Sequence, residues 1–487
     1  MRLASKLADQ FKAEFSGRVI ATISSSILTV LLARLLEPDS YGLLFLAISI
    51  YGIVKLFSKL GIARSASRYL AEYRETDADQ IPYILKTSFL LNALTILLTG
   101  FVLFIGKEHI AELIGRPELS PFLALGALFI GFSSLLSYVR FILQGFERVE
   151  LSSTVHAADR TCRLFLAVGF VLLGYDVIGA LLGYIISAAL VSTGGLLFIY
   201  ISFYRGFEKN PREPDLRRRI IKYAIPLTAT NTATVLDKRI DMVLIGFFLN
   251  PSAVAFYTAG RQIVQFIKMP MASLGFTLSP MYGSQKANGD SDTAARIYET
   301  SLSYGLLLYI PISAGVILIA EPLIELVFGS EYLGAVPILH VFSLYIVLES
   351  VTELTNTSLD YLGRARSRAI IQLITAVLNV LLNIILIPLI GIVGAAIATV
   401  ITHSLYTLAN VYIINLELSL RFGFILRNLL YSIGIAIAIS IPVYGILNFS
   451  LGVISLFISI FLGGLIWILL IQILGLVNVR KVVSTLT

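Results

Sequence analysis

Apolar stretches of about 20 residues recur along the chain from residue 17 to residue 476, and only short polar segments separate them. A helix of about 20 apolar residues is long enough to cross the hydrocarbon core of a bilayer. Hydrophobic residues make up 57% of the chain and charged residues 14%, which excludes an ordinary soluble domain. The pattern therefore predicts an all-α polytopic membrane protein.

The apolar stretches predict fourteen transmembrane helices. They lie at residues 16–36, 41–62, 83–106, 120–144, 155–174, 177–203, 219–249, 254–282, 300–320, 333–358, 367–390, 392–415, 425–448 and 451–476. With the termini counted, one side of the membrane carries roughly 20 basic residues, and the other carries only Lys107 and Arg116. The positive-inside rule then predicts that both termini are cytoplasmic, as in a multi-pass protein of the cell (plasma or inner) membrane.

An internal repeat predicts two lobes. Glu37-Pro38 recurs as Asn250-Pro251 at an offset of 213, and Leu60-Gly61 recurs as Leu274-Gly275 at an offset of 214. Six spans separate the copies, so both halves enter the membrane in the same sense, as in parallel-repeat transporters. The predicted domains are an interfacial amphipathic helix at 1–15, an N-lobe of six helices at 16–203, a cytoplasmic linker at 204–218, a C-lobe of six helices at 219–415, and two further helices with a tail at 416–487.

The seventh predicted span contains the charges Asp237, Lys238, Arg239 and Asp241. Each charge near the centre of a bilayer costs roughly 2.5–3.5 kcal/mol on insertion scales. The cluster either compensates its own charges and ties helices together, or lines a polar cavity in a transporter. The cost favours the second interpretation. We therefore predict that Lys238 and Arg239 line the cavity and that the carboxylates at 237 and 241 take part in ion coupling.

Further charges lie in other predicted spans. Arg261 and Lys268 are seven residues apart and share a helix face, which suits a cavity that receives phosphate groups, and Arg18 is a weaker third candidate. Glu349 and Glu353 share a face at four-residue spacing. They either bind a coupling proton or cation, or neutralise an arginine.

Charges in the fifth predicted span have a simpler explanation. Asp159 and Arg163 are four residues apart, so we expect them to form a structural ion pair. Lys55 and Lys59, at the inner end of the second span, either snorkel to the membrane surface or serve a function.

Several classes of function are excluded. The chain has no nucleotide-binding glycine-rich loop and no H-E-x-x-H motif, so it is not expected to hydrolyse ATP itself or to be a zinc protease. Cys162 is the only cysteine, so neither an intrachain disulfide nor a cysteine-rich metal site is possible. The net charge of +7 arises from basic residues in alternate loops, so it does not indicate nucleic-acid binding. No cofactor is expected.

Five segments of the sequence resemble a known family. They lie at residues 33–42, 241–257, 326–332, 362–364 and 391–396. They are similar to signatures of the polysaccharide and lipid-linked oligosaccharide flippases, within the multidrug/oligosaccharidyl-lipid/polysaccharide exporter superfamily. The resemblance implies two six-helix lobes around a central cavity, two extra C-terminal helices and alternating access. The chain lacks the arginine-rich first-span motif associated with the cell-wall-precursor flippases.

Three functions are therefore compared. The first is flipping of a polyprenyl-(pyro)phosphate-linked oligosaccharide, with membrane lipids and glycosyltransferases or polymerases of the same pathway as partners. The second is an ion-coupled multidrug or small-molecule exporter of the same superfamily, whose cavity should be more acidic. The third is a membrane glycosyltransferase or polymerase, which would need acidic catalytic residues on a sizeable outer loop. The predicted outer loops are too short for that, so the resemblance and the charges together favour a flippase, which is a transporter and not an enzyme.

Overall fold

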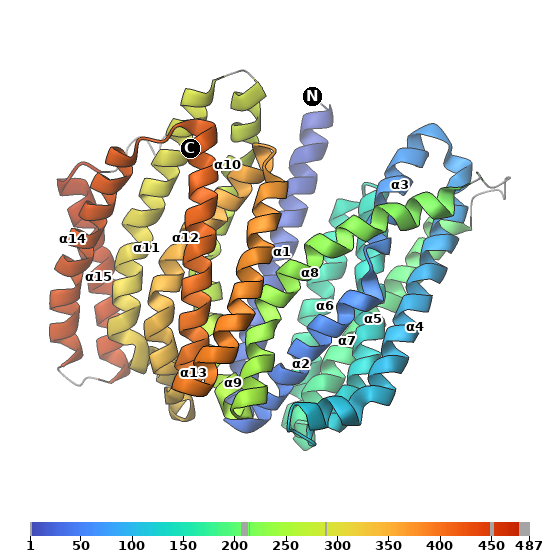
Figure 1. Cartoon of the computed structure of the whole chain (residues 1–487), viewed down its shortest axis with the longest axis horizontal. Coiled ribbons are helices and arrows are strands. Elements are labelled where there is room, and N and C mark those ends of the chain that lie inside the picture. Colours follow the sequence, from blue (N-terminus) through green and yellow to red (C-terminus); the bar gives the residue numbers. More distant parts are fainter. Residues whose placement is uncertain (1, 206–212, 214, 288–289, 449–451, 477–487) are drawn as a thin grey trace. The chain divides into compact units, whose positions relative to one another are not determined.

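The computed structural model describes residues 2–205, 213, 215–287, 290–448 and 452–476. Every secondary-structure element within these ranges is a helix (Figure 1), which confirms the predicted all-α class. The chain forms two compact units, Met1–Ala255 and Phe256–Thr487. The predicted lobe boundaries at residues 203 and 219 stay a prediction.

Unit 1 contains eight long helices and three short ones. They are α1 (Arg2–Leu35), α2 (Pro38–Lys59), α3 (Ile62–Thr76), η1 (Ala78–Gln80), α4 (Ile81–Leu113), α5 (Leu119–Gly145), α6 (Val149–Phe170), η2 (Val171–Tyr175), α7 (Asp176–Ile199), η3 (Tyr200–Tyr204) and α8 (Leu216–Phe248). The helix α9 (Pro251–Ile267) begins in this unit. Residues 2–15, predicted as a separate interfacial helix, continue into the first span without a break.

Unit 2 contains the rest of α9 and the helices that follow it. They are α10 (Met269–Ala287), α11 (Ser291–Val327), η4 (Ser330–Ala335), α12 (Val336–Tyr361), α13 (Ala365–Leu418), α14 (Phe422–Leu447) and α15 (Val453–Ile473). The last two form the predicted C-terminal helix pair and lie side by side (Figure 1). Arg421, just before α14, forms an ion pair at 2.5 Å with Glu299 of α11, whose carboxylate is buried. This contact fixes the start of the helix pair against the rest of the unit.

Ten helical segments of the described residues are long and apolar enough to cross a membrane. Two of them, Val149–Tyr204 and Ala365–Leu418, would each be roughly 80 Å long as one straight helix, against a hydrocarbon core of about 30 Å. Each is interrupted near its middle. In α13 the break lies at Ile390 and Gly391, where Gly391 has a φ of 64° that a side chain would disfavour. These breaks lie where the sequence predicted the ends of spans, and the total of fourteen spans stays a prediction.

The predicted span at 254–282 is not one continuous helix. The structure breaks it at Lys268, which lies between the end of α9 and the start of α10. Pro270 lies two residues further on, and a proline has no backbone N–H to continue the hydrogen-bond pattern of the preceding helix. The prediction of an uninterrupted helix was therefore wrong at this point.

The predicted linker at 204–218 lies largely outside the described residues. Glu213 is described, and its carboxylate accepts hydrogen bonds from Tyr73 of α3 and Arg219 of α8. Its backbone N–H donates to the side chain of Gln80 at 3.2 Å. These contacts hold this end of α8 against α3 and η1.

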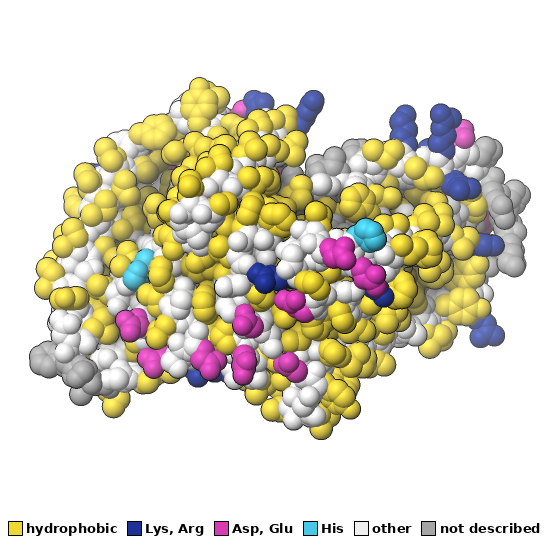
Figure 2. All heavy atoms as spheres, turned by 60° about the horizontal axis from the view of Figure 1, so that its bottom comes forward, with side chains coloured by type: hydrophobic (Ala, Val, Ile, Leu, Met, Phe, Trp, Pro, Cys, Tyr) yellow, Lys and Arg dark blue, Asp and Glu magenta, His cyan; other side chains and the backbone are white. Residues whose placement is uncertain are grey.

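The surface has the character expected of a protein in lipid. Figure 2 shows hydrophobic side chains over much of the face turned forward. Large apolar side chains such as Phe101 and Phe165 are 63% and 70% exposed, although burial would normally stabilise them in water. This is therefore a multi-pass membrane protein.

Candidate functional site

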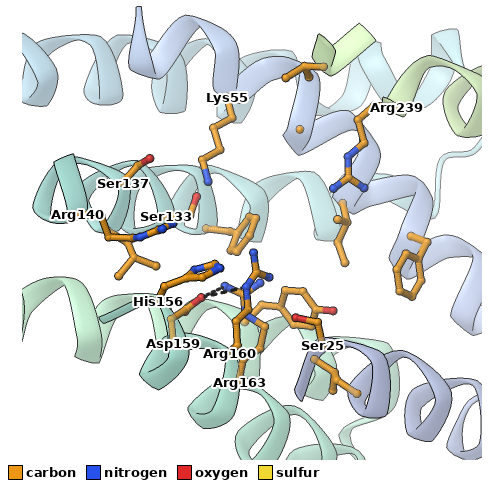
Figure 3. A pocket seen from close by; sticks show the side chains of 18 of the residues that line it. Ser25, Lys55, Ser133, Ser137, Arg140, His156, Asp159, Arg160, Arg163 and Arg239 are labelled. Atoms are coloured by element: carbon orange, nitrogen blue, oxygen red, sulfur yellow. Dashed lines mark hydrogen bonds and ion pairs between the residues drawn. The ribbon is translucent and has the colours of Figure 1, made fainter. Parts of the chain in front are cut away.

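A cavity of about 440 Å³ lies inside unit 1, among α1, α2, α5, α6, α7 and α8. Figure 3 shows basic side chains pointing into it from several helices. The basic residues that line it are Lys55, Lys59, Arg140, Arg160, Arg163 and Arg239. Asp159 is the one carboxylate among the described lining residues. We call this space the cationic cavity.

Helical spacing brings these side chains to the cavity. On α2, Gly52, Lys55 and Lys59 are three and four residues apart, so they share one face of the helix. On α5, Ser137 and Arg140 follow the same spacing. Each helix therefore presents a polar stripe to the cavity, while its other faces remain apolar for packing and lipid.

Asp159 organises the α6 side of the cavity. Its carboxylate forms an ion pair with Arg163 at 2.6 Å, and Asp159 and Arg163 are 1% and 5% exposed. Arg160 is more distant from the same carboxylate, at 3.9 Å. Ser187 of α7 donates a hydrogen bond to Asp159 Oδ1 at 3.1 Å. The predicted pair of Asp159 with Arg163 is thus confirmed.

The other cations are held by aromatic, hydroxyl and backbone contacts. The Lys55 ammonium lies 5.6 Å from the ring centroid of Phe129, and Lys59 donates to Ser137 Oγ at 2.9 Å. The Arg239 side chain packs against Gly52 of α2. A Cβ atom added to Gly52 would lie only 3.2 Å from Arg239 Nε. The absence of a side chain at Gly52 therefore makes room for the Arg239 guanidinium.

The cavity carries a strong positive potential. Among the described lining residues, six basic side chains face one carboxylate, which leaves five basic side chains without a carboxylate to balance them. Like charges in a poorly solvated space repel one another, which is unfavourable for the fold alone. Arginine and lysine side chains bind phosphate oxygens through charge-assisted hydrogen bonds. The cationic cavity is thus suited to a multiply charged anion such as a phosphate or pyrophosphate ester.

Of the predicted site residues whose side chains the structure describes, one lines this cavity. Arg239 does so, as predicted. Asp241, on the same helix, is 1% exposed and is not among the lining residues. Arg18 is an exposed residue of α1 in an ion pair with Glu14 at 2.8 Å. The side chains of residues 237 and 238 (Asp237 and Lys238) lie outside the described part of the chain, so the roles predicted for them stay predictions.

Three other predicted residues meet in unit 2. The Lys268 ammonium lies 3.3 Å from Glu349 Oε2 and 3.0 Å from Glu353 Oε1. Tyr345 donates a hydrogen bond to Glu349 Oε1 at 2.6 Å. The two carboxylates therefore compensate a lysine, where the sequence had suggested an arginine as one alternative. The coupling role of the glutamates and the phosphate role of Lys268 stay predictions.

Arg261 lies on α9, within unit 2. It is partly buried, and its guanidinium lies 5.9 Å from the ring centroid of Tyr257. The hydroxyl of Tyr257 is in turn hydrogen-bonded to Thr399 at 2.9 Å. These contacts hold the α9 side chains within unit 2, and the phosphate role of Arg261 also stays a prediction.

The residue pattern of each span, taken alone, does not indicate most of the cavity. Lys55, Lys59 and Arg163 had adequate explanations as snorkelling or ion-paired residues, and Arg140 and Arg160 were not selected. One signal was present in the sequence. The predicted spans of the first lobe contain more cations than nearby carboxylates can neutralise, and several recur at three- and four-residue spacing.

Comparison with known families identifies the chain. Residues 13–286 match the family model described as "Polysaccharide biosynthesis protein", which is more than half of the chain. The chain belongs to this family. A second model, described as MatE, matches residues 226–385. The residues matched by the polysaccharide biosynthesis protein family model include every described residue that lines the cationic cavity.

Two kinds of relative are similar over most of the chain. The "Probable low-salt glycan biosynthesis flippase Agl15" of Haloferax volcanii is 25% identical over 443 residues, which cover 89% of each chain. The solved structure "Lipid II flippase MurJ, inward closed conformation" has a TM-score of 0.76 at 17% identity, covering 97% of this chain and 99% of that one. An inward-facing multidrug resistance MATE family transporter has a TM-score of 0.66 at 14% identity, with 82% and 94% covered. Because the sequence identities are this low, the two solved structures establish only the fold of this member of the polysaccharide biosynthesis protein family. That fold agrees with the predicted superfamily.

Proposed function

We propose that this member of the polysaccharide biosynthesis protein family flips a polyprenyl-(pyro)phosphate-linked oligosaccharide from the cytoplasmic to the outer leaflet. The transport serves cell-surface polysaccharide or glycoprotein glycan assembly, and it proceeds by alternating access without a bond being made or broken. The observation that carries the proposal is the cationic cavity, whose described lining has six basic side chains and one carboxylate inside an apolar helical unit. An anionic phosphate linked to a lipid matches this charge.

The family and the glycan flippase relative support the same substrate class. The Haloferax relative is named for flipping in glycan biosynthesis, and it aligns with this chain over nearly its whole length. The membrane lipid, the lipid-linked oligosaccharide and the glycosyltransferases or polymerases that supply or consume it are the proposed partners. We place the protein in the cell membrane with both termini cytoplasmic, on the basis of the loop charges.

A multidrug exporter is the second candidate, because the MatE model matches residues 226–385. A carrier of cationic drugs needs carboxylates to compensate its substrate. The cationic cavity has the opposite charge. The anionic lipid-linked sugar therefore remains the better match.

The test is deletion of the gene in its own host, followed by extraction of lipid-linked glycans. We expect one polyprenyl-linked oligosaccharide to accumulate and to be accessible only from the cytoplasmic side. Plasmid-borne expression of the intact chain should reverse both effects. Unchanged amounts and unchanged sidedness of every lipid-linked glycan would contradict the proposal.

The buried carboxylates are proposed to couple transport to an ion gradient. We expect Asp241→Asn and Glu349→Gln each to reduce export about tenfold and to weaken its dependence on pH or sodium. Both replacements keep the side-chain volume, so the protein should stay folded. The measurement is export into proteoliposomes under imposed gradients.

An exposed carboxylate provides the control for coupling. Glu75→Gln changes a side chain that is 72% exposed, so export should be unchanged. If both buried replacements export as fast as the wild type, with the same ion dependence, these carboxylates have only a structural role.

The outer turns of unit 1 are proposed to report alternating access. Asp39 Oδ1 accepts hydrogen bonds from the backbone N–H of Ser252 at 3.1 Å and from its hydroxyl at 2.5 Å. We expect spin labels at Ser40→Cys and Ser252→Cys, in a Cys162→Ser background, to give two distance populations. The coupling ion or the lipid substrate should shift their ratio, because each binds the two states with different affinity. A single narrow distance in a transport-competent protein, unchanged by pH, sodium or substrate, would exclude opening at these turns.

A further inference from the structure

A second cavity of about 320 Å³ adjoins the cationic cavity inside unit 1. The two share the lining residues Lys59, Ser137, Arg140 and Val235, so they are neighbouring compartments. The second one extends past Gly61 and Arg64, near the ends of α2 and α5 that the loop charges place on the cytoplasmic side.

The side chains that line only the second cavity have a different chemistry. Four of them, Asn92, Ser134, Gln144 and Thr228, are uncharged and polar, and Arg64 is the one charged side chain among the described ones. Phe141 and two leucines provide apolar surface beside them. Amide and hydroxyl groups next to an aromatic ring match the hydroxyls and the apolar ring face of a sugar. We call this space the polar compartment.

Asn92 gives the strongest indication of a ligand. It is 1% exposed, and its side-chain oxygen has no hydrogen-bond partner among the described residues. Its amide nitrogen donates to the backbone oxygen of Ser58 at 3.2 Å, but Thr95 already donates to that oxygen at 2.8 Å. A carbonyl oxygen can accept both bonds, so the Asn92 nitrogen is satisfied, while its side-chain oxygen remains an unpaired buried acceptor.

Arg140 has a matching unpaired donor. Its Nε atom is buried and has no hydrogen-bond partner within the described residues, and the side chain lines both compartments. A sugar hydroxyl both donates and accepts hydrogen bonds, so it can satisfy the Asn92 oxygen and the Arg140 nitrogen. Asn92 and Arg140 thus offer complementary groups to the same class of ligand.

We infer that the polar compartment binds the sugar directly attached to the phosphate, while the cationic cavity holds the phosphate itself. This inference rests on the proposed function and adds an orientation to it, with the glycan directed toward the cytoplasmic ends of α2 and α5. The volume is at the lower end of the range of about 300–1,000 Å³ for small-molecule sites. The compartment therefore recognises the first sugar rather than a long glycan.

The test compares two soluble probes on the purified full chain. One is farnesyl pyrophosphate, and the other is farnesyl pyrophosphate carrying glucose, galactose or N-acetylglucosamine. Wild-type protein should bind at least one sugar-bearing probe more tightly than the sugar-free probe. Asn92→Leu should lower the affinity for that sugar-bearing probe about tenfold and leave the affinity for farnesyl pyrophosphate unchanged. Leucine keeps the side-chain volume but removes the hydrogen-bond acceptor.

Stability provides a second measurement. Asn92→Leu removes an unpaired buried group, so its melting temperature should equal or exceed that of the wild type. Asn428→Leu is the matched control, since this buried asparagine of α14 donates to Ser303 and Phe424 and lines neither cavity. It should lower the melting temperature and leave both affinities unchanged.

Three outcomes decide between the claims. If Asn92→Leu weakens the binding of both probes equally, or changes the binding of neither, the sugar assignment is wrong while the phosphate site stands. If the wild type binds sugar-bearing and sugar-free probes equally, the assignment is also wrong. If the wild type binds neither probe, the proposed function fails, and the sugar site fails with it.

Discussion

Replacing Lys55 by methionine should reduce export of the lipid-linked glycan by about ten- to a hundredfold, the effect expected when a hydrogen bond to a charged group is lost. Lys55 faces the cationic cavity above Phe129 and forms no direct ion pair with a carboxylate among the described side chains. Methionine keeps the length and the apolar contact but removes the charge. Because the neighbouring cations repel Lys55, the protein should fold as well as the wild type or better.

Lys107 offers a matched control for this experiment. Its ammonium also lies over a phenylalanine, 4.4 Å from the ring centroid of Phe104, but it lines neither described cavity of the proposed substrate path. The Lys107→Met protein should therefore export the lipid-linked glycan at the wild-type rate. Export by Lys55→Met at the wild-type rate and expression level would remove Lys55 from the proposed phosphate site.

Asp159→Asn should have two opposite effects. The buried Arg163 loses its ion-pair partner, and breaking a buried pair costs about 3–5 kcal/mol, so the melting temperature should fall. The cavity also loses its one described carboxylate, so its affinity for anions should rise. Inorganic pyrophosphate should therefore raise the melting temperature of the variant more than that of the wild type.

The exposed ion pair of Asp360 with Arg368 provides the comparison. Both side chains are partly exposed, at 42% and 26%, and such pairs contribute about 0–1 kcal/mol. Asp360→Asn should therefore change neither the melting temperature nor its response to pyrophosphate. An Asp159→Asn protein that is as stable as the wild type and no more responsive to pyrophosphate would contradict the proposed electrostatic role of Asp159.

The sequence predicted the helical class, most span positions and the ion pair within α6. Those features depend on residues close together in the chain, such as Asp159 and Arg163, whose spacing alone brings them together. The break at Lys268 was not predicted, because the apolar residues around Pro270 are also typical of a continuous membrane span.

The cationic cavity could not be predicted in the same way. Helical periodicity gives the face on which Lys55 or Arg140 lies, but not which helix packs opposite that face. A lysine near a helix end is explained equally well by snorkelling. The contact of Lys268 with Glu349 could not be predicted for the same reason, because 81 residues separate the two in the sequence.

In the proposed alternating-access cycle, we expect the surplus of basic side chains in the cavity to couple transport to the membrane voltage. When an empty cavity changes its access from one side to the other, its uncompensated cations move through part of the transmembrane field. Each elementary charge moved through 100 mV changes the free energy by about 2.3 kcal/mol. A bound (pyro)phosphate cancels part of that charge, so the loaded carrier responds less to the field. A potential that is negative inside therefore favours return of the empty cavity to the cytoplasmic side, where the next substrate is loaded.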